Sequence, residues 1–477
     1  MKKIFASVAV IIVTITSATA QSMQTTYFLD NNMYSYRINP AIASEKGFVG
    51  FVFNNLNFTA GSSIGVNSLI YPTPNGLVTG FNKAIPTQEF LGNLKAQNRF
   101  DVEENIALLS IGFWTKHDFF NNIEVNVRGY QNAGIPKDLF GMLKSGSGTY
   151  DLSRTSVNAQ SYLEVAYGLS KKINDVVAIG VRLKFLAGLE NLNVSATNAN
   201  FLIGGQSLKY DSDLTLRCAA NMLRIPTKPS AQDPSRTVLD YGNIGFINDI
   251  TPSGYGGAID LGITVKPVKG LTISLAALDL GAVNWTYNVV GVNRGGEFNG
   301  LEMKNISIDA VSDEVQAVWN KLQEFVEFTP EEAGQKSLEL MPINVNLGVR
   351  YRLPAYERLS FGALGTYRIN KYLRFWEVRA GAAVTPIDWF SITANYGCNS
   401  NGLTYGTALS LNFASINLTL GWEGYSGKSG RYITQNNTAV LFPLGGFRYN
   451  LNLGFTITFG PRHRDYTVKK KLWATGK

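Results

Sequence analysis

The stretch "GGFRYNLNLGFTITFG", residues 445–460, alternates apolar and polar positions without interruption. The apolar positions are Tyr449, Leu451, Leu453, Phe455, Ile457 and Phe459, and the positions between them are Arg448, Asn450, Asn452, Gly454, Thr456 and Thr458. Successive side chains of a β-strand point to opposite faces, so this strand has one apolar and one polar face. A soluble sandwich would bury the apolar face against a second sheet, whereas a membrane barrel would turn it toward lipid. The strand alone is compatible with both.

Alternation of this kind recurs along most of the chain. Examples lie at residues 175–190, 342–354 and 376–386, and the repeated period of two predicts a sheet with one apolar and one polar face. Most of these segments reach the roughly 9 to 11 tilted residues that a membrane strand needs, whereas strands of soluble sandwiches commonly have about 5 or 6. Their length therefore favours a membrane barrel.

The polar face also favours the barrel, because it carries full charges in mid-strand. These are Arg182, Lys184, Asp260, Arg350, Arg379 and Glu423. The apolar face carries bulky aromatic residues near strand ends, namely Tyr351, Tyr367, Trp376, Tyr396 and Trp422. A polar interior and aromatic girdles on the lipid face are typical of outer-membrane barrels. We therefore predict an all-β protein, a transmembrane antiparallel β-barrel of about 14 strands.

The amino terminus predicts export. Lys2 and Lys3 precede an apolar run over residues 4–15, and small residues follow up to Ala20. This is the layout of a secretory signal cut after Ala20, and the run is shorter than the roughly 20 residues of a spanning helix. An uncleaved anchor is the alternative. Export and the barrel pattern together predict the cell outer membrane as the location, with membrane lipid and the barrel assembly machinery as partners.

These signals divide the chain of 477 residues into four parts. We predict a signal peptide at 1–20, a periplasmic or lumenal amino-terminal segment at 21–46, the barrel at 47–460, and a basic periplasmic tail at 461–477. Short polar links predict periplasmic turns at 171–175, 267–270, 353–358, 385–388 and 414–415. Residues 191–220 read as a hairpin that rises above the membrane, and residues 62–98 could hide a further strand pair.

Three segments break the strand pattern and predict short helices. They are residues 86–98, residues 135–148 with a stop at Gly146, and residues 311–328 as a helical insertion in a loop. The simpler interpretation is that these helices cap or line the mouth of the barrel. A moving gate or a docking helix is the alternative.

No catalytic, metal or cofactor site can be argued from the sequence. His117 lies in an expected turn and His463 in the basic tail, and neither stands beside an inward serine on a neighbouring strand. The chain has no paired-cysteine or HExxH motif and no phosphate loop, so we predict no enzyme and no cofactor. Cys218, in an expected loop, and Cys398, at a strand end, could form one disulfide bond. Export makes a nucleic-acid partner improbable, and no basic patch interleaved with aromatics suggests one.

Three stretches resemble a known family. They are "NNMYSYRINPAIASEKGFVGF" at 31–51, the hairpin at 162–192, and "LAALDLGAVNWTYNV" at 275–289. They resemble an uncharacterised family of exported barrels from Bacteroidota, which is similar to the long-chain fatty acid transporter (FadL-like) barrels and to the barrel proteins of type nine secretion. The resemblance implies a 14-strand barrel with its amino terminus tucked into the lumen. Its motifs, "NPA" at 39–41 and "DLG" at 279–281, mark bends and strand ends rather than reactive groups.

The polar face supplies the candidate functional residues, which are those expected to line the lumen. They are Arg182, Lys184, Asn344, Asn346, Arg350, Arg352, Arg368, Glu377, Arg379, Glu423, Arg448, Asn450 and Asn452. Parity also turns Glu124, Arg128, Glu164 and Asp260 inward. Two interpretations remain open: ion pairs that pack the lumen or hold a plug, or a mildly basic path for an anionic or amphipathic solute.

Two functions follow from these interpretations. The first is a transporter or channel for a hydrophobic or amphipathic solute, in which the helices and the amino-terminal segment gate the lumen. The second is a structural or docking barrel of the cell envelope or secretion machinery, which binds an envelope protein and transports nothing.

Overall fold

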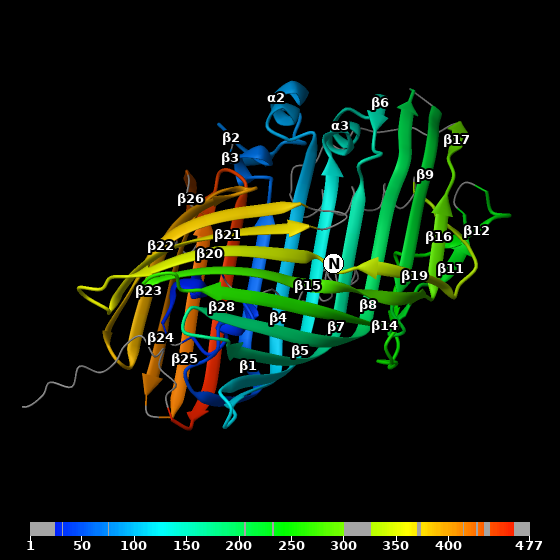
Figure 1. Ribbon diagram of the computed structural model, residues 1–477. Helices are drawn as coiled ribbons and strands as arrows, with labels where there is room; N and C mark the ends of the chain where they lie inside the picture. The colour runs from blue at the N-terminus through cyan, green and yellow to red at the C-terminus, as the bar shows by residue number, and fades with distance from the viewer. Residues whose placement is uncertain are drawn as a thin grey trace, which may run out of the picture.

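The computed structural model describes residues 24–461, apart from 31, 75, 205–206, 231–232, 300–325, 370–373, 414, 426–427 and 434–438. In these residues fourteen antiparallel strands close into one ring, so the predicted barrel is confirmed (Figure 1). In order around the ring the strands are β1 (Gly47–Ser62), β4 (Gln97–Trp114), β5 (Phe119–Pro136), β7 (Ser156–Lys172), β8 (Val177–Ile203), β14 (Gly254–Val265), β15 (Leu271–Tyr287), β20 (Ile343–Arg352), β21 (Leu359–Ile369), β22 (Phe375–Ile387), β23 (Phe390–Asn399), β24 (Gly402–Phe413), β25 (Ile416–Tyr425) and β28 (Phe447–Phe459). Within the described residues, no helix has the length and apolarity needed to span a bilayer.

The strand at 447–459 decides what the outer face of the barrel meets. Leu451, Leu453, Phe455, Ile457 and Phe459 are 37–46% exposed, although all are apolar. Arg448, Asn450 and Asn452, which alternate with them, are buried inside the ring. A closed ring offers no second sheet to cover the apolar face, so lipid is its solvent.

The two ends of the barrel differ. The five predicted short links are confirmed as strand connections at one end, as is the turn around His117 between β4 and β5. At the other end β8 continues beyond the ring and pairs with β9 (Ser207–Ala219), so the predicted hairpin is also confirmed (Figure 1). Three short strands join this extension: β6 (Gly148–Asp151), β16 (Val289–Asn293) and β17 (Gly296–Asn299). β18 (Thr329–Pro330) pairs with β16, and β19 (Gln335–Leu340) pairs with the upper half of β15.

The remaining elements lie in the connections. α2 (Thr87–Gly92) and α3 (Lys137–Ser145) confirm two of the predicted helices, and the positive φ of Gly146 ends the second, as expected. Of the third predicted helix, residues 311–325 lie outside the described residues, as do the signal peptide and residues 462–477. The remaining pairs are β2 (Ile70–Thr73) with β3 (Gly76–Thr79), β10 (Leu223–Arg224) with β13 (Gly245–Phe246), β11 (Thr227–Pro229) with β12 (Thr237–Leu239), and β26 (Ser429–Ile433) with β27 (Ala439–Pro443). The pair β2–β3 is the hidden pair anticipated within 62–98, and it stands outside the ring.

The expected loop position of Cys218 is wrong. The residue lies near the end of β9, and its side chain is buried in an apolar cluster beneath the extension. β9 pairs with β8 and with β16 at this position, so Cys218 is part of the extended sheet. Cys218 and Cys398 are both free thiols.

The wall is interrupted in β1. Against β28 the register shifts between Val49 and Asn55, so five β1 residues stand opposite two β28 residues. Val52 and Phe53 have φ values of 33° and 58°. These two side chains and that of Phe51 are 58–67% exposed on the outer surface. β1 therefore carries an outward bulge, residues 51–54, at its seam with β28.

A charge on the lipid face provides a test of the membrane position. We expect Leu453→Arg to destabilise the barrel by about 2 to 4 kcal/mol, because Leu453 lies halfway along β28, and Tyr449→Arg, near the strand end, to cost about 0 to 1 kcal/mol. Urea unfolding in lipid vesicles measures both. Equal costs at the two positions would contradict a lipid-facing wall.

Candidate functional site

The candidate site is the filled lumen. The amino-terminal segment, residues 24–46, lies inside the barrel and includes two short 3₁₀ helices, η1 (Gln24–Phe28) and η2 (Ser35–Arg37). A further one, η3 (Val66–Ser68), lies after β1. We call residues 24–46 the lumenal segment. It contacts opposite parts of the wall, because η1 packs against β21–β25 whereas η2 reaches β5.

The first attachment of the lumenal segment is at β25. The backbone N–H and the hydroxyl of Thr25 both donate to the Glu423 carboxylate, at 2.8 and 2.6 Å. The other oxygen of Glu423 lies 3.2 Å from Arg379, which is also paired with Glu377. The wall thus presents two carboxylates and one guanidinium here, and the lumenal segment supplies the additional donors.

The second attachment is at β20. Arg350 and Arg352 both donate to the Asp30 carboxylate, at 2.5 and 2.7 Å, and the Thr385 hydroxyl donates to its other oxygen at 3.0 Å. Burial raises the pKa of Asp30, but the two arginines and the hydroxyl outweigh this effect and hold the pKa below its ordinary value. Asp30 is therefore ionised at neutral pH and binds the segment to the wall.

The third attachment is a forked contact made by Arg37. Its Nε and Nη2 donate to Glu124 Oε1 at 2.9 and 2.6 Å, and its Nη1 donates to Asn55 Oδ1 at 2.7 Å. Nη2 also reaches Asn126 Oδ1 at 3.3 Å. The guanidinium stacks over the ring of Tyr34 at 4.8 Å from its centroid. The contacts use all three guanidinium nitrogens.

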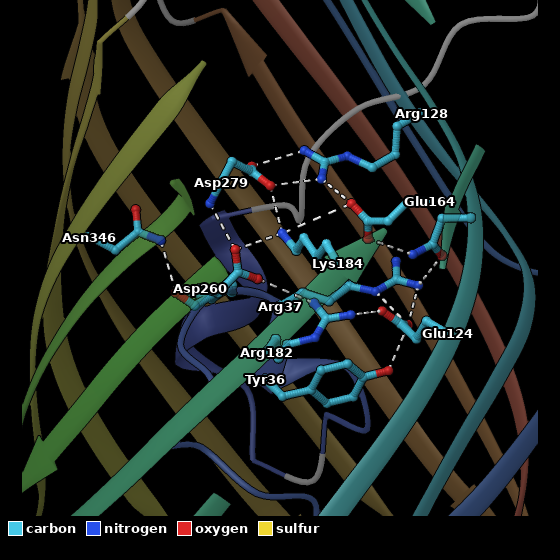
Figure 2. Close-up of polar contacts among 12 residues, drawn as sticks. Tyr36, Arg37, Glu124, Arg128, Glu164, Arg182, Lys184, Asp260, Asp279 and Asn346 are labelled. Atoms are coloured by element: carbon cyan, nitrogen blue, oxygen red, sulfur yellow. Dashed lines mark hydrogen bonds and ion pairs between the residues drawn. The ribbon is translucent and has the colours of Figure 1, made fainter. Parts of the chain in front are cut away.

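Glu124 joins this contact to a larger cluster at the centre of the lumen (Figure 2). Each carboxylate in the cluster lies against at least one cation, and the shared partners make the cluster continuous. Its members are Arg37, Glu124, Arg128, Glu164, Arg182, Lys184, Asp260 and Asp279, and we call it the central charge cluster. The four carboxylates and three of the four cations come from β5, β7, β8, β14 and β15. The fourth cation is Arg37.

The "NPA" motif seats the lumenal segment on β8, β14 and β15, the wall strands that lie between those of the second and third attachments. The Asn39 side chain donates to the carbonyls of Ile263 and Leu275, at 3.2 and 3.1 Å. Pro40 lies against Gly180, where an added Cβ would stand 2.2 Å from the Pro40 carbonyl. At Gly262, which pairs with Gly180 across the sheet, a Cβ would stand 2.1 Å from Asn39 Oδ1. Glycine is required at both positions because the segment touches the wall backbone.

Little free space is left at the centre. The cavity beside the central charge cluster has a volume of about 30 Å³, roughly the volume of one water molecule. A second cavity of about 860 Å³ lies toward the end with short turns. The lumenal segment forms part of its lining, together with Lys171 at the end of β7 and the turns that carry Lys269 and Glu357. The lumen is thus blocked in the middle and hollow at the turn end.

The structure places the predicted lumen residues in several groups. Arg182 and Lys184 belong to the central charge cluster, and Arg350 and Arg352 hold Asp30. Eleven of the thirteen are buried, and Arg350 and Arg352 are half-buried. Of the other nine, Glu377, Arg379 and Glu423 meet near Thr25. Arg368 pairs with Glu103 and donates to Asn344, and Arg448 pairs with Asp101 and Glu103. Asn346 donates to the Ile38 carbonyl, and Asn450 and Asn452 lie buried on β28.

Several partners of these residues have no signal in the sequence. The "DLG" motif predicts a bend or strand end at Asp279, but the residue lies inside β15, where its φ of 61° forms a bulge that turns its carboxylate into the lumen. Thr25, Asp30 and Arg37 were not singled out because the lumenal segment has no strand period to fix their direction. Among the described residues, no group of His, Cys, Asp and Glu could hold a metal ion.

A single methyl group on the wall tests the seat of the "NPA" motif. Gly262→Ala should displace residues 39–41, because its Cβ would overlap Asn39, at a cost of about 1 to 3 kcal/mol for overpacking. We expect the variant to show higher conductance than wild type in planar bilayers. Gly365→Ala is the control, since its nearest neighbouring atom lies 3.8 Å away. Unchanged conductance in a correctly folded Gly262→Ala barrel would contradict this role of the motif.

The pKa of Asp30 gives a pH dependence. A carboxyl whose pKa falls on folding stabilises the folded arrangement above its ordinary pKa, and this contribution disappears as the pH falls through the lowered value. The protection factors of residues 27–30 and 32–33, that is, the intrinsic exchange rate at each pH divided by the observed rate, should therefore be constant from about pH 7 to 5 and fall below about pH 4. Asp30→Asn should raise the exchange rate at neutral pH, whereas Asp175→Asn, in an exposed turn, should not. Identical behaviour of wild type and Asp30→Asn would exclude the proposed attachment.

Comparison with known proteins gives a family and solved structures of low sequence identity. No curated protein matches the chain. The solved structures similar to it include a FadL homologue from Pseudomonas aeruginosa (11% identity, TM-score 0.46, 93% of this chain and 98% of that chain). They also include the toluene transporters TbuX from Ralstonia pickettii (8%, 0.43, 93% and 99%) and TodX from Pseudomonas putida (9%, 0.41, 93% and 95%). At these values the likeness carries no argument about a solute. A family model described as a family of unknown function, DUF5723, matches residues 40–423, and the chain belongs to this family.

Proposed function

We propose that the protein is a gated outer-membrane transporter for a hydrophobic or amphipathic solute. One observation carries this proposal: the bulge in β1 is bonded to the lumenal segment. The Tyr34 hydroxyl donates to the backbone carbonyl and the side chain of Asn54, at 3.0 and 2.8 Å, and Arg37 bonds the next residue, Asn55. A movement of the segment would therefore act directly on β1, whose outward bulge lies on the apolar outer surface.

The bulge has the properties expected of a movable part. Two non-glycine residues with positive φ, one of them the β-branched Val52, cost about 1 to 3 kcal/mol each. Such strain persists where the surrounding structure holds it, and it clusters at functional sites. Asn54 supplies that hold, since it accepts from Tyr34 and donates to the Ala107 carbonyl of β4 at 3.2 Å. Release of Tyr34 would remove one of these two restraints.

In this proposal the structure is the closed state. The lumenal segment and the central charge cluster block the middle of the barrel, and the 860 Å³ cavity lies on the turn side of that block. Withdrawal of the segment would open the lumen and loosen the bulge. A solute would then leave either sideways between β1 and β28, into the bilayer, or downward through the cavity.

A sealed docking barrel is the second candidate, and the filled centre favours it. Each attachment of the lumenal segment is buried or half-buried, and each includes a charged partner. The extension built on β8 and β9 has its own apolar core, which includes Tyr210, Leu214 and Leu216. A closed barrel with a rigid extension at one end could present a surface to another envelope protein.

Regularising β1 tests the transporter. Deletion of residues 52–54 would align Phe51 and Asn55 with consecutive residues of β28 and keep the inward and outward alternation. We expect this barrel to assemble and to take up labelled oleate and toluene into vesicles at least about tenfold more slowly than wild type. That factor corresponds to about 1.4 kcal/mol in the barrier. The control is Val52→Gly with Phe53→Gly, which keeps the bulge because glycine adopts positive φ without strain.

The two candidates predict different outcomes. Equal uptake by the deletion variant, the glycine control and wild type would contradict a route at the bulge. No uptake by wild type, together with one discrete partner trapped by crosslinking in intact cells, would favour the docking barrel instead.

A further inference from the structure

The contact of Arg37 has the composition of a ligand-binding site. On the wall side it consists of one carboxylate and two amide oxygens, from Glu124, Asn126 and Asn55. They bind the guanidinium through all three of its nitrogens. Planar, forked recognition of this kind distinguishes a guanidinium from an ammonium group, which offers a single compact charge.

The wall side of this site is held by contacts within the wall, and Tyr36 of the lumenal segment adds one more by donating to Glu124 Oε1 at 2.7 Å. Asn55 on β1 and Asn126 on β5 both pair with Ala107 of β4, so three adjacent strands hold them at one level. Glu124 precedes Asn126 by two residues on β5 and lies on the same face. Its Oε2 accepts from Arg182 at 2.6 Å, and its Oε1 accepts from the Ser110 hydroxyl at 3.2 Å. These wall contacts orient Glu124 whether or not Arg37 is bound.

The wall side of the central charge cluster has an excess of negative charge, which a cation at this position neutralises. Within the central charge cluster the wall contributes four carboxylates and three cations, and Arg37 makes the numbers equal. The side chain of Glu124 is fully buried. Removal of Arg37 would leave a buried cluster with a net charge of −1, and such an imbalance costs several kcal/mol unless another cation replaces it.

We propose that the inner wall carries a guanidinium-binding site, formed by Asn55, Glu124 and Asn126, which Arg37 occupies as a tethered ligand and which a free alkylguanidinium can occupy in its place. The chemical class of the ligand is a monosubstituted guanidinium, such as an arginine side chain on another molecule. A molecule of this class competes with Arg37 and so favours release of the lumenal segment. The site is a property of the wall and does not require that the barrel transports a solute.

Arg37→Ala in the full-length protein tests the proposal. The purified variant in detergent is titrated calorimetrically with ethylguanidinium, ethylammonium and N-ethylurea. Ethylguanidinium should bind at least about tenfold more tightly than ethylammonium, a difference of about 1.4 kcal/mol. N-ethylurea, which has the planar shape without the charge, should not bind. Wild type should show no binding at the same concentrations because Arg37 fills the site.

A second variant separates the site from unspecific binding. Adding Glu124→Gln to Arg37→Ala removes the carboxylate and should abolish the binding of ethylguanidinium. If Arg37→Ala alone does not fold, ethylguanidinium in the refolding buffer should restore its heat-modifiable migration, whereas ethylammonium should not. Equal binding of the two cations, binding that survives Glu124→Gln, or refolding that neither cation restores would overturn the proposal. None of these results depends on solute uptake, so the proposed transport can fail independently.

Discussion

Charges that lie away from water in the lumen must find partners within the protein, and this requirement shapes the interior of the barrel. Taking an ion out of water costs several kcal/mol even after relaxation, and a buried pair recovers that cost only with good geometry. The central charge cluster meets the requirement by sharing: Lys184 lies within 4.0 Å of three carboxylates, and Arg128 contacts two. No side chain in it can change partner without affecting the next. Five strands are thus connected across the lumen as well as along the wall.

The same need for partners explains why the lumenal segment is bound to the inner wall of the barrel. Each attachment joins the segment to a charged side chain of the wall. Thr25 donates to the carboxylate of Glu423, Asp30 pairs with Arg350, and Arg37 pairs with Glu124. Between them, aromatic rings such as Tyr36 and Phe48 stack and fill the remaining space. The apolar rings exclude water, and its exclusion strengthens the charged contacts beside them. The apolar and the charged contacts of the lumenal segment therefore strengthen each other.

The sequence predicted the wall better than the interior, and the reason is geometric. Period two fixes the face of each strand residue, so the inward direction of Arg182 and Lys184 and the outward direction of Leu453 followed directly. Parity gives no height along the barrel, so the partners of those charges could not be assigned. It also fails at bulges: Asp279 changes face because one residue with positive φ is inserted in β15. For Arg37 no period exists, and only its contacts across the lumen reveal its role.

The attachments of the lumenal segment also order events in time. Its first described residues bind Glu423 on β25, the strand that pairs with the last strand of the ring, while Arg37 binds β5 near the start. The lumenal segment, near the start of the sequence, therefore needs a partner on β25, near its end. Contacts so distant in sequence form late, because the long intervening chain must first be ordered. The full set of contacts of the segment therefore needs β5 and β25 in place together, and these two strands lie on opposite sides of the seam between β1 and β28.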